Sequence, residues 1–290
     1  MASKVYFTKE LTPEAVVKMY DVLGVKLPGK VAVKLHSGEA GNQNFLGPIW
    51  VKPLVKHLNA TVVECNTAYP GERDTSEKHL KLLKDHGWST TFKVDLLDEK
   101  GPDAVLPIPH GVHLHEDYVG KDLLNYDSLL IFSHFKGHPM GGYGGALKQL
   151  SIGCASSFGK LHIHSAGSDK PDEIWTADHD SFLESMAEAA SAVVAHFKGK
   201  IAYVSVMKNM SVDCDCCSVA EDPCLQDIGI LSSLDPIALD QACLDLVMAS
   251  KDPGKAHFME RVNSRHGIHT IERAVELGYG SREYQLIEVK

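Results

Sequence analysis

The sequence predicts an α/β fold: a largely parallel sheet with flanking helices, and an irregular cysteine-bearing loop in the C-terminal half. Short β-branched runs, VAVKL at 31–35 and ATVVEC at 60–65, alternate with the helical patterns at 51–58 and 76–87. Helices that alternate with strands in this way are typical of crossover connections between parallel strands. A less regular stretch at 102–115, rich in proline and histidine, interrupts the rhythm and is expected to be a loop or a short hairpin.

The second half of the chain continues the alternation. Its periodicity predicts strands at 127–133, 200–207 and 227–233, and helices at 178–197 and 235–249. Asp235 and Pro236 suit the N-cap and the first position of the last of these helices. The length of 290 residues is enough for one large domain or two smaller ones. Because no linker interrupts the chain, we expect a single elaborated α/β domain over 1–290, with lobes at 1–125 and 126–290 as the alternative division.

The charge and hydropathy of the chain exclude some classes of partner. The net charge is −9 and no dense block of Lys and Arg occurs, which argues against nucleic acid as a partner. No run approaches the roughly 18 apolar residues of a membrane span, and the first residues, MASKVYFTKEL, become polar too early for a secretory signal. We therefore expect a cytoplasmic protein that binds no membrane. Seven cysteines in that compartment indicate reduced thiols, metal ligands or redox groups rather than disulfides.

Four of the cysteines lie in one segment, NMSVDCDCCSVAEDPC at 209–224, with the spacing C-x-C-C-x6-C. Thiolates packed this closely suit an iron-sulfur cluster, zinc or copper. Cys214 and Cys216 are two residues apart, so in an extended chain both side chains point to one face, whereas Cys217 points away. Cys224 follows a proline and can fold back across the loop. The spacing matches neither bacterial ferredoxins nor common zinc folds, so the pattern alone leaves the metal open.

A second motif, SHFKGHPMGGYGGALK at 133–148, follows the predicted strand at 127–133. Glycine-rich turns let backbone N–H groups approach an anion, and a helix N-terminus adds favourable partial charge. The motif is not a Walker A sequence, and a dinucleotide-binding unit would want an acidic residue at the end of the next strand. The sequence therefore predicts a site for a phosphate or carboxylate group. The alternative is that the glycine-rich turn serves only the packing of the helix and binds no ligand.

A third motif, VAVKLHSGEAGNQNF at 31–45, also follows a strand. Ligands of open α/β sheets bind outside the carboxyl ends of the strands, so this loop and the one at 133–148 are expected to share a crevice. Histidine can act there as an acid or base, and lysine can hold an anionic substrate. The predicted catalytic residues are His36, His134, Lys136 and His138. The predicted anion-binding residues are Lys34, Gly144, Gly145 and Lys148. Taken singly, each histidine is more often a surface or hydrogen-bonded residue than a catalyst.

Cys154 follows the glycine-rich motif, in SIGCASSFGKLHIHS at 151–165. If it joins Cys214 and Cys216 on one centre, the metal lies beside the anion pocket and the separate motifs form one candidate active site. Cys65 and Cys243 lie in apolar patterns and are expected to be ordinary buried thiols.

The strings VAVKLHSGEAGN, SHFKGHPMGGYGGALKQLSIGCASSFGKLHIHS, DCDC and DIGILSSLDPIALDQACLDLV together resemble domain-of-unknown-function family 362, whose members are often labelled iron-sulfur center proteins. The resemblance covers most of the chain between residues 30 and 250. It implies a cluster-binding protein in which Cys154, Cys214 and Cys216 are the recurring thiols and the loop at 134–148 is the recurring polar group. Cys224 is the leading candidate for a fourth ligand, ahead of Cys217.

Three functions are compatible with these observations. The first is an enzyme in which a [4Fe-4S] cluster lies beside a cationic His/Lys pocket for a small anionic substrate. Three cysteine ligands would leave one iron open to act as a Lewis acid, which favours a lyase, whereas a reductive reaction favours an oxidoreductase. The second is an electron carrier with a closed cluster and a redox partner such as a ferredoxin. The third is a structural zinc site in a protein whose function lies elsewhere.

Overall fold

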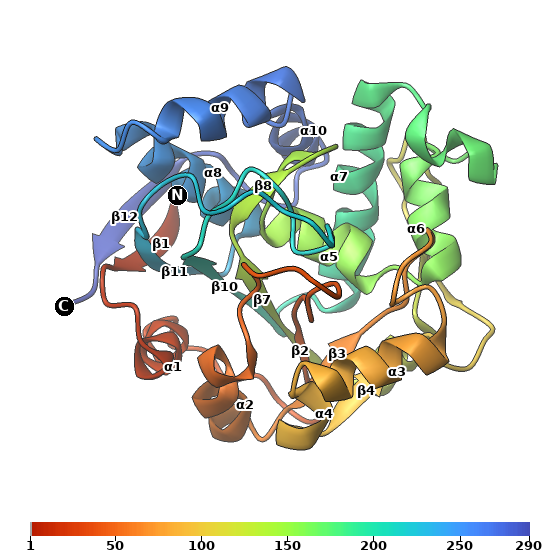
Figure 1. The fold of residues 1–290 in the computed structure, drawn as a ribbon, viewed down its shortest axis with the longest axis horizontal. Coiled ribbons are helices and arrows are strands. Elements are labelled where there is room, and N and C mark those ends of the chain that lie inside the picture. Colours follow the sequence, from red (N-terminus) through yellow and green to blue (C-terminus); the bar gives the residue numbers. More distant parts are fainter. Residues whose placement is uncertain (1) are drawn as a thin grey trace.

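One eight-stranded sheet runs through the computed structural model, which describes residues 2–290 (Figure 1). The spatial order of the strands is β12 (Tyr284–Glu288), β1 (Ser3–Thr8), β11 (Gly229–Ser233), β10 (Ile201–Met207), β7 (Ser128–His134), β2 (Val31–Lys34), β3 (Thr61–Glu64) and β4 (Val94–Leu96). Only β11 is antiparallel to its two neighbours, so the sheet is mostly parallel. The predicted fold class is confirmed.

The central strands β7 and β10 are buried along their whole length. Strands covered on both faces read as continuous apolar runs, as SLLIFS does here. Because side chains alternate across a strand, Leu129 and Ile131 enter the hydrophobic core on one face, and Leu130 and Phe132 enter the core on the other. The sheet therefore separates two cores.

Four helices cover the first face of the sheet, and their apolar side chains fill the smaller core. They are α1 (Pro13–Asp21), α2 (Lys52–Leu58), α3 (Ser76–Asp85) and α4 (Trp88–Thr91). Thr12 and Thr75 begin α1 and α3 as N-caps, since each side chain accepts a hydrogen bond from the first turn of its helix. The 3-10 turn Pro48–Trp50 leads into α2.

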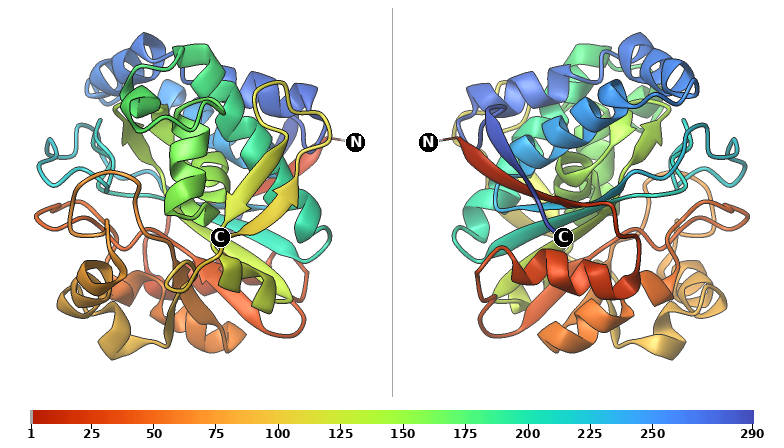
Figure 2. Two further views of the ribbon diagram at one scale, coloured as in Figure 1. Left: turned by 90° about the vertical axis from the view of Figure 1, so that its right-hand side faces the viewer. Right: turned by 90° about the vertical axis from the view of Figure 1, so that its left-hand side faces the viewer.

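Six helices contribute to the larger core. They lie on the opposite side of the sheet from α1 and α2 (Figure 2). They are α5 (Ala146–Cys154), α6 (Ser157–His164), α7 (His179–His196), α8 (Pro236–Ala249), α9 (Lys255–Ser264) and α10 (His269–Glu276). Every residue of α5 is buried, because this helix packs against both β7 and α7. Two further 3-10 turns lie at Lys121–Asn125 and Pro171–Trp175.

Two short hairpins lie outside the main sheet. The irregular segment at 102–115 belongs largely to the first, in which β5 (Ala104–Pro107) pairs with β6 (Glu116–Val119). In the second, β8 (Lys136–His138) pairs with β9 (Gly142–Gly144) directly after β7. This second hairpin carries two of the predicted site residues.

The order of strands reverses at β2. The chain proceeds from β2 outward to β3 and β4, and later returns to place β7 on the other side of β2. Ligand sites of open α/β sheets occur at the carboxyl ends of strands at such a switch point. The loops after β2, β7 and β10 all leave the sheet at this edge. None of the helices in the described part of the chain is long and apolar enough to cross a membrane.

Candidate metal centre

An irregular loop, residues 208–228, leaves the carboxyl end of β10 and carries the thiols of Cys214, Cys216 and Cys217. The loop after β2 holds it from one side. There the side-chain amide of Asn42 donates hydrogen bonds to the carbonyls of Cys214 (3.3 Å) and Cys217 (2.9 Å). The backbone N–H of Glu39 donates to the carbonyl of Asp215 (2.8 Å). These bonds fix the part of the loop that bears the thiols.

Strand β8 holds the same loop from the other side. The N–H of Gly137 donates to the carbonyl of Ser211 (2.8 Å), and a Cβ at residue 137 would collide with the backbone of Val212. Glycine is therefore required for this close approach of two backbones. From α9, Arg261 donates a hydrogen bond of 2.8 Å to the carbonyl of Val212.

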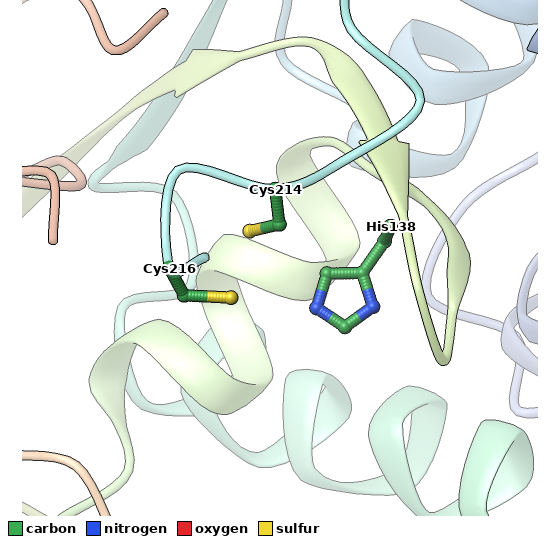
Figure 3. Close-up of side chains that lie close together, drawn as sticks. All are labelled: His138, Cys214 and Cys216. Carbon is green, nitrogen blue, oxygen red and sulfur yellow. The ribbon is translucent and has the colours of Figure 1, made fainter. Parts of the chain in front are cut away.

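Three donor atoms, one each from His138, Cys214 and Cys216, lie within 4.8 Å of one another. Figure 3 shows the two thiols on the loop and the His138 ring on β8 arranged around one space. Cys214 is completely buried, and His138 is buried as well. The structure thus contains a cysteine and histidine group that could hold a metal ion. Its two cysteines lie in the loop where the sequence predicts metal ligands, and its histidine lies on β8.

The His138 ring is oriented by the turn between β8 and β9. Its Nδ1 atom accepts hydrogen bonds from the backbone N–H groups of Gly141 (2.8 Å) and Met140 (3.1 Å). Since Nδ1 is the acceptor, the proton of the neutral ring resides on Nε2, on the side of the ring that faces the thiols in Figure 3. Burial lowers the pKa of His138, although the charge of Cys214 opposes this effect. In this arrangement the ring presents an N–H donor to Cys214.

Cys214 is the thiol that most readily becomes a thiolate. Burial alone would raise its pKa, but a hydrogen bond from Cys216 and the charges of Lys148 and Lys136 outweigh burial, so the pKa lies well below its ordinary value. Lys148 Nζ lies 3.5 Å from Cys214 Sγ. Cys216 is hydrogen-bonded to both Cys214 and Cys217, which raises its own pKa and lowers that of Cys217. The three thiols therefore form one connected group.

Asp215 lies between the two thiols in sequence and binds two of the predicted catalytic residues. Its carboxylate lies 2.8 Å from His134 Nδ1 and 2.9 Å from Lys136 Nζ, and all three side chains are buried. Burial raises the pKa of Asp215, but His134 and Lys136 outweigh it and lower that pKa. Burial lowers the pKa of Lys136, but Asp215 outweighs it and raises that pKa. The other nitrogen of His134 faces the carbonyl of Lys208. His134 and Lys136 therefore hold Asp215 in place.

The motifs described so far all lie within one region that matches a known family. The model of the family described as Domain of unknown function (DUF362) matches residues 31–245. The chain belongs to this family. The DUF362 match runs from β2 into α8, so it includes the cysteine loop and the loops after β2 and β7.

Two solved structures resemble the DUF362 chain at low sequence identity. The lactate racemase apoprotein from Thermoanaerobacterium thermosaccharolyticum is 16% identical with a TM-score of 0.42, over 69% of this chain and 50% of that chain. A protein from Thermotoga maritima is 13% identical with a TM-score of 0.45, over 91% of this chain and 58% of that chain. The chain therefore spans less than two thirds of the length of either protein. No curated protein matches it.

The DUF362 chain keeps two other predicted residues in buried contacts of their own. Lys34 Nζ forms a buried ion pair with Glu64 (2.7 Å). Burial raises the pKa of Glu64, but Lys34 outweighs it, so that pKa lies well below its ordinary value. His36 accepts a hydrogen bond from the Gly38 N–H at Nδ1 (3.0 Å), while its Nε2 faces Arg73 at 3.4 Å. Burial and the charges of Arg73 and Lys148 lower the pKa of His36 well below its ordinary value.

The N-terminus of α5, where the sequence predicts an anion site, is occupied by the protein's own carboxylate. Asp240 from α8 accepts hydrogen bonds from the N–H groups of Ala146 (2.7 Å) and Leu147 (2.9 Å). A Cβ at Gly145 would collide with the Asp240 carboxylate, and Gly144 lies against the side chain of Lys136. Burial raises the pKa of Asp240 to about 7. The two glycines admit these neighbours; binding of an external anion by them stays a prediction.

The structure does not bring the other two predicted metal ligands into the group of His138, Cys214 and Cys216. Cys154 ends α5, its Sγ lies 3.7 Å from the carbonyl of Gln149, and burial raises its pKa to about 12. Cys224 donates from Sγ to the carbonyl of Met210 (3.4 Å), and burial raises its pKa to about 11. Metal binding by these two cysteines stays a prediction from the sequence. Cys65 and Cys243 are buried.

A cavity of about 470 Å³ opens next to Cys216 and Cys217. The only charged side chains that line it are Glu39 and Glu72. Arg73 lies behind Glu39 and binds its carboxylate at 3.1 Å. Lys136 and Lys148 therefore lie on the buried side of the thiols. Glu39 and Glu72 line the cavity on the other side, through which a small molecule would reach Cys216 and Cys217.

Sequence reasoning did not single out Arg73, Tyr69, Glu64 or Asp240. Arg73 and Tyr69 lie on the loop between β3 and α3, at the same carboxyl edge of the sheet as the predicted residues. Tyr69 forms a hydrogen bond with Cys216, and burial raises the pKa of Tyr69 well above its ordinary value. The rule that sites gather at strand ends would have found this loop, since β3 is the next strand along the chain from β2.

Proposed function

We propose that the protein binds a [4Fe-4S] cluster through Cys214, Cys216 and Cys217, next to a small anionic substrate. The observation that carries this proposal is the group of three thiols, of which Cys214 is buried and Cys216 and Cys217 are partly buried, and in which Cys216 is hydrogen-bonded to both neighbours. Thiolates are the ligands that iron-sulfur clusters require. Three ligands from one loop leave the fourth to Cys154, to Cys224 or to the substrate.

The charges around the thiols support a centre of this kind. Lys148 and Lys136 lower the pKa of Cys214, and thus favour the thiolate that binds metal. Positive charge also compensates the negative charge that several thiolates bring into a buried site. N–H donors directed at sulfur tune the reduction potential of a cluster, and Lys148 and His138 present such donors to Cys214.

The orientation of His138 favours an all-thiolate centre over a Cys2His zinc site. A metal-bound imidazole nitrogen must offer a lone pair, but the two backbone N–H groups at Nδ1 leave the proton of the neutral ring on Nε2. In this tautomer His138 is a hydrogen-bond donor beside the thiols. The same N–H can donate a hydrogen bond to a substrate bound there.

An enzymatic role assigns tasks to residues of this chain. When bound, the cluster would supply an open iron as a Lewis acid or carry an electron from a redox partner such as a ferredoxin. His138 would donate a hydrogen bond from Nε2 and so orient the substrate. The amine of Lys148 would hold a negatively charged oxygen of the substrate, and Asp215 would keep His134 and Lys136 in place. Reduced thiols suit the cytoplasm, which is the compartment we propose.

Metal analysis after anaerobic purification tests the proposal. We expect iron and acid-labile sulfide in equal amounts, with broad visible absorption, and loss of both in Cys214→Ser and Cys216→Ser. Cys243→Ser is the matched control, because Cys243 is buried in α8 and lies outside the group. Cys154→Ser and Cys224→Ser decide whether either is a fourth ligand. Stoichiometric zinc without iron or sulfide would contradict the proposal.

A single zinc ion is the second candidate, and one observation favours it. The donors of His138, Cys214 and Cys216 lie within 4.8 Å, a spacing that one ion can span. Two cysteines, one histidine and an open position form the ligand set of a catalytic zinc site. This candidate requires the His138 ring to adopt its other tautomer. His138→Gln should then abolish metal binding, whereas an iron-sulfur cluster should survive the substitution with a changed reduction potential.

A further inference from the structure

A second group of metal-ligating side chains lies away from the cysteine loop, around the start of α10. One donor atom from each of His266, His269 and Glu272 lies within 4.8 Å of the other two. His269 and Glu272 are neighbours on the surface of α10, since they are three residues apart, and His266 lies in the turn that precedes this helix. The two imidazole rings stack, with centroids 4.9 Å apart and an interplanar angle of 13°.

Each histidine is oriented by a carboxylate from α7. Asp180 lies 2.8 Å from Nδ1 of His266, and Glu184 lies 2.9 Å from Nε2 of His269. Metal-binding histidines almost always donate their other ring N–H to a carboxylate or carbonyl in this manner. The neutral rings therefore keep a lone pair on Nε2 of His266 and on Nδ1 of His269.

The lone pair of His269 faces another acceptor. Its Nδ1 lies 3.5 Å from a carboxylate oxygen of Glu272. Two acceptors at this separation repel each other unless a proton or a cation lies between them. Ligands bound 2.0–2.1 Å from a tetrahedral zinc ion are themselves about 3.3 Å apart. The nitrogen and the oxygen are thus already at the spacing of two ligands of one ion.

The charge around the group also favours a cation. Three carboxylates, those of Asp180, Glu184 and Glu272, surround the two rings. Arg282 competes with an ion for Glu272, since it lies 3.6 Å from the second oxygen of that carboxylate. The other oxygen of Glu184 binds His113 (2.8 Å), which fixes the orientation of that carboxylate.

We propose that His266, His269 and Glu272 bind a divalent transition metal ion, with zinc as the best fit to two imidazoles and one carboxylate. The half-exposed His266 and Glu272 leave a fourth position open to solvent. Glu184 and Asp180 hold the two rings in the ligating orientation. The ion joins α10 to α7 through these carboxylates.

The site lies against the turn that orients His138. Gly267, between the two histidines, packs so closely on Gly141 and Gly142 that a Cβ on either side would press into the other backbone. The N–H of Gly141 is the donor to Nδ1 of His138. An ion at this site therefore stiffens the support of the candidate metal centre without belonging to it.

Cobalt titration of a thiol-free centre tests the proposal separately from the proposed function. The full-length triple variant with Cys214→Ser, Cys216→Ser and Cys217→Ser serves as the background, so that these three thiols do not compete for metal. We expect it to bind one equivalent of Co²⁺ with visible ligand-field absorption and no thiolate charge-transfer band, and to exchange the cobalt for zinc. Adding His269→Ala should weaken binding at least about 100-fold, and adding Glu184→Gln about 10-fold to 100-fold.

His57→Ala is the matched control, because His57 is a half-exposed histidine that pairs with a single carboxylate, Asp21. Its affinity for cobalt should equal that of the background. Glu272→Gln tests the carboxylate ligand without changing its size. Thermal melts without metal confirm that each variant folds. Absence of cobalt binding in the background, or equal binding after His269→Ala, would show that the group consists only of ordinary ion pairs.

Discussion

The cysteine centre and the histidine group on α10 are built with opposite charge arrangements. At the buried cysteine centre, thiols that become anionic are surrounded by Lys136, Lys148 and the His138 N–H donor. At the half-exposed histidine group, two imidazole rings are surrounded by carboxylates. Burial explains the difference, since an unpaired charge costs far more in the core than at the surface. The buried centre therefore needs its counter-charges within the fold, whereas solvent shares that task at the surface.

The largest expected effect follows from removing the carboxylate that binds the buried side chains of His134 and Lys136. Asp215→Asn leaves Lys136 without its ionic partner in the core, and breaking a buried pair costs about 3–5 kcal/mol. We expect that loss in the free energy of unfolding, measured with urea. Asp227→Asn is the control, because Asp227 pairs with Lys208 at a partly exposed position, where the expected loss is below about 1 kcal/mol. Equal losses in both variants would show that burial does not set the cost.

A smaller effect is expected at the thiol itself. Lys148→Met removes a positive charge 3.5 Å from Cys214 Sγ, so the pKa of Cys214 should rise toward its ordinary value, and the thiolate fraction at neutral pH should fall. A rise of about one pKa unit corresponds to about 1.4 kcal/mol. The pH dependence of the ultraviolet absorbance of the thiolate in the metal-free protein measures it, because Cys214 is too buried for a modifying reagent.

The expected rise in the pKa of Cys214 can be checked against two control variants. Because the wild-type pKa is depressed, the thiolate absorbance of the wild type should persist to lower pH than that of Lys148→Met. Cys214→Ser identifies the signal of this thiol, and Lys170→Met removes a surface lysine as control. A pH profile that does not move in Lys148→Met would contradict the assigned role of this lysine.

The smallest effect is expected at the histidine group without metal. Glu184→Gln weakens two partly exposed histidine pairs, and such pairs contribute at most about 1 kcal/mol each to stability. We expect a change of that size in the free energy of unfolding at pH 7, measured with urea. High salt should reduce the difference between wild type and variant, since it screens surface pairs. If Glu184→Gln lowered the free energy of unfolding as much as Asp215→Asn, the two regions would not differ in the stability that their charged pairs contribute.

Much of the arrangement at the sheet edge follows from local sequence patterns. The apolar run SLLIFS predicts β7, and the polar residues after β2 and β7 meet because both strands are parallel and adjacent. The partners of those residues come from distant segments. Asp215 reaches His134 across 81 positions, and Asp240 reaches Ala146 across 94 positions. No local pattern encodes such pairs.

Cys154 illustrates a second limit of sequence proximity. It lies close to Lys148 in the chain, and the two share α5. A helix rises about 1.5 Å per residue, so six positions separate the two side chains by about 9 Å along the axis. Lys148 therefore reaches Cys214 from near the start of the helix, while Cys154 faces other neighbours at its end. Two residues that are close in sequence share a site only if the secondary structure between them brings their side chains together, and a helix of six positions does not do so here.

The contact between Gly137 and the backbone of Val212 has a consequence for metal uptake. This close contact and the hydrogen bond from Gly137 to Ser211 attach the hairpin that carries His138 to the segment that carries Cys214. The donor geometry is thus present before any ion arrives, and little chain entropy remains to be lost on binding. Loading of the centre should depend on passage through the cavity beside Cys216 rather than on folding of the loop.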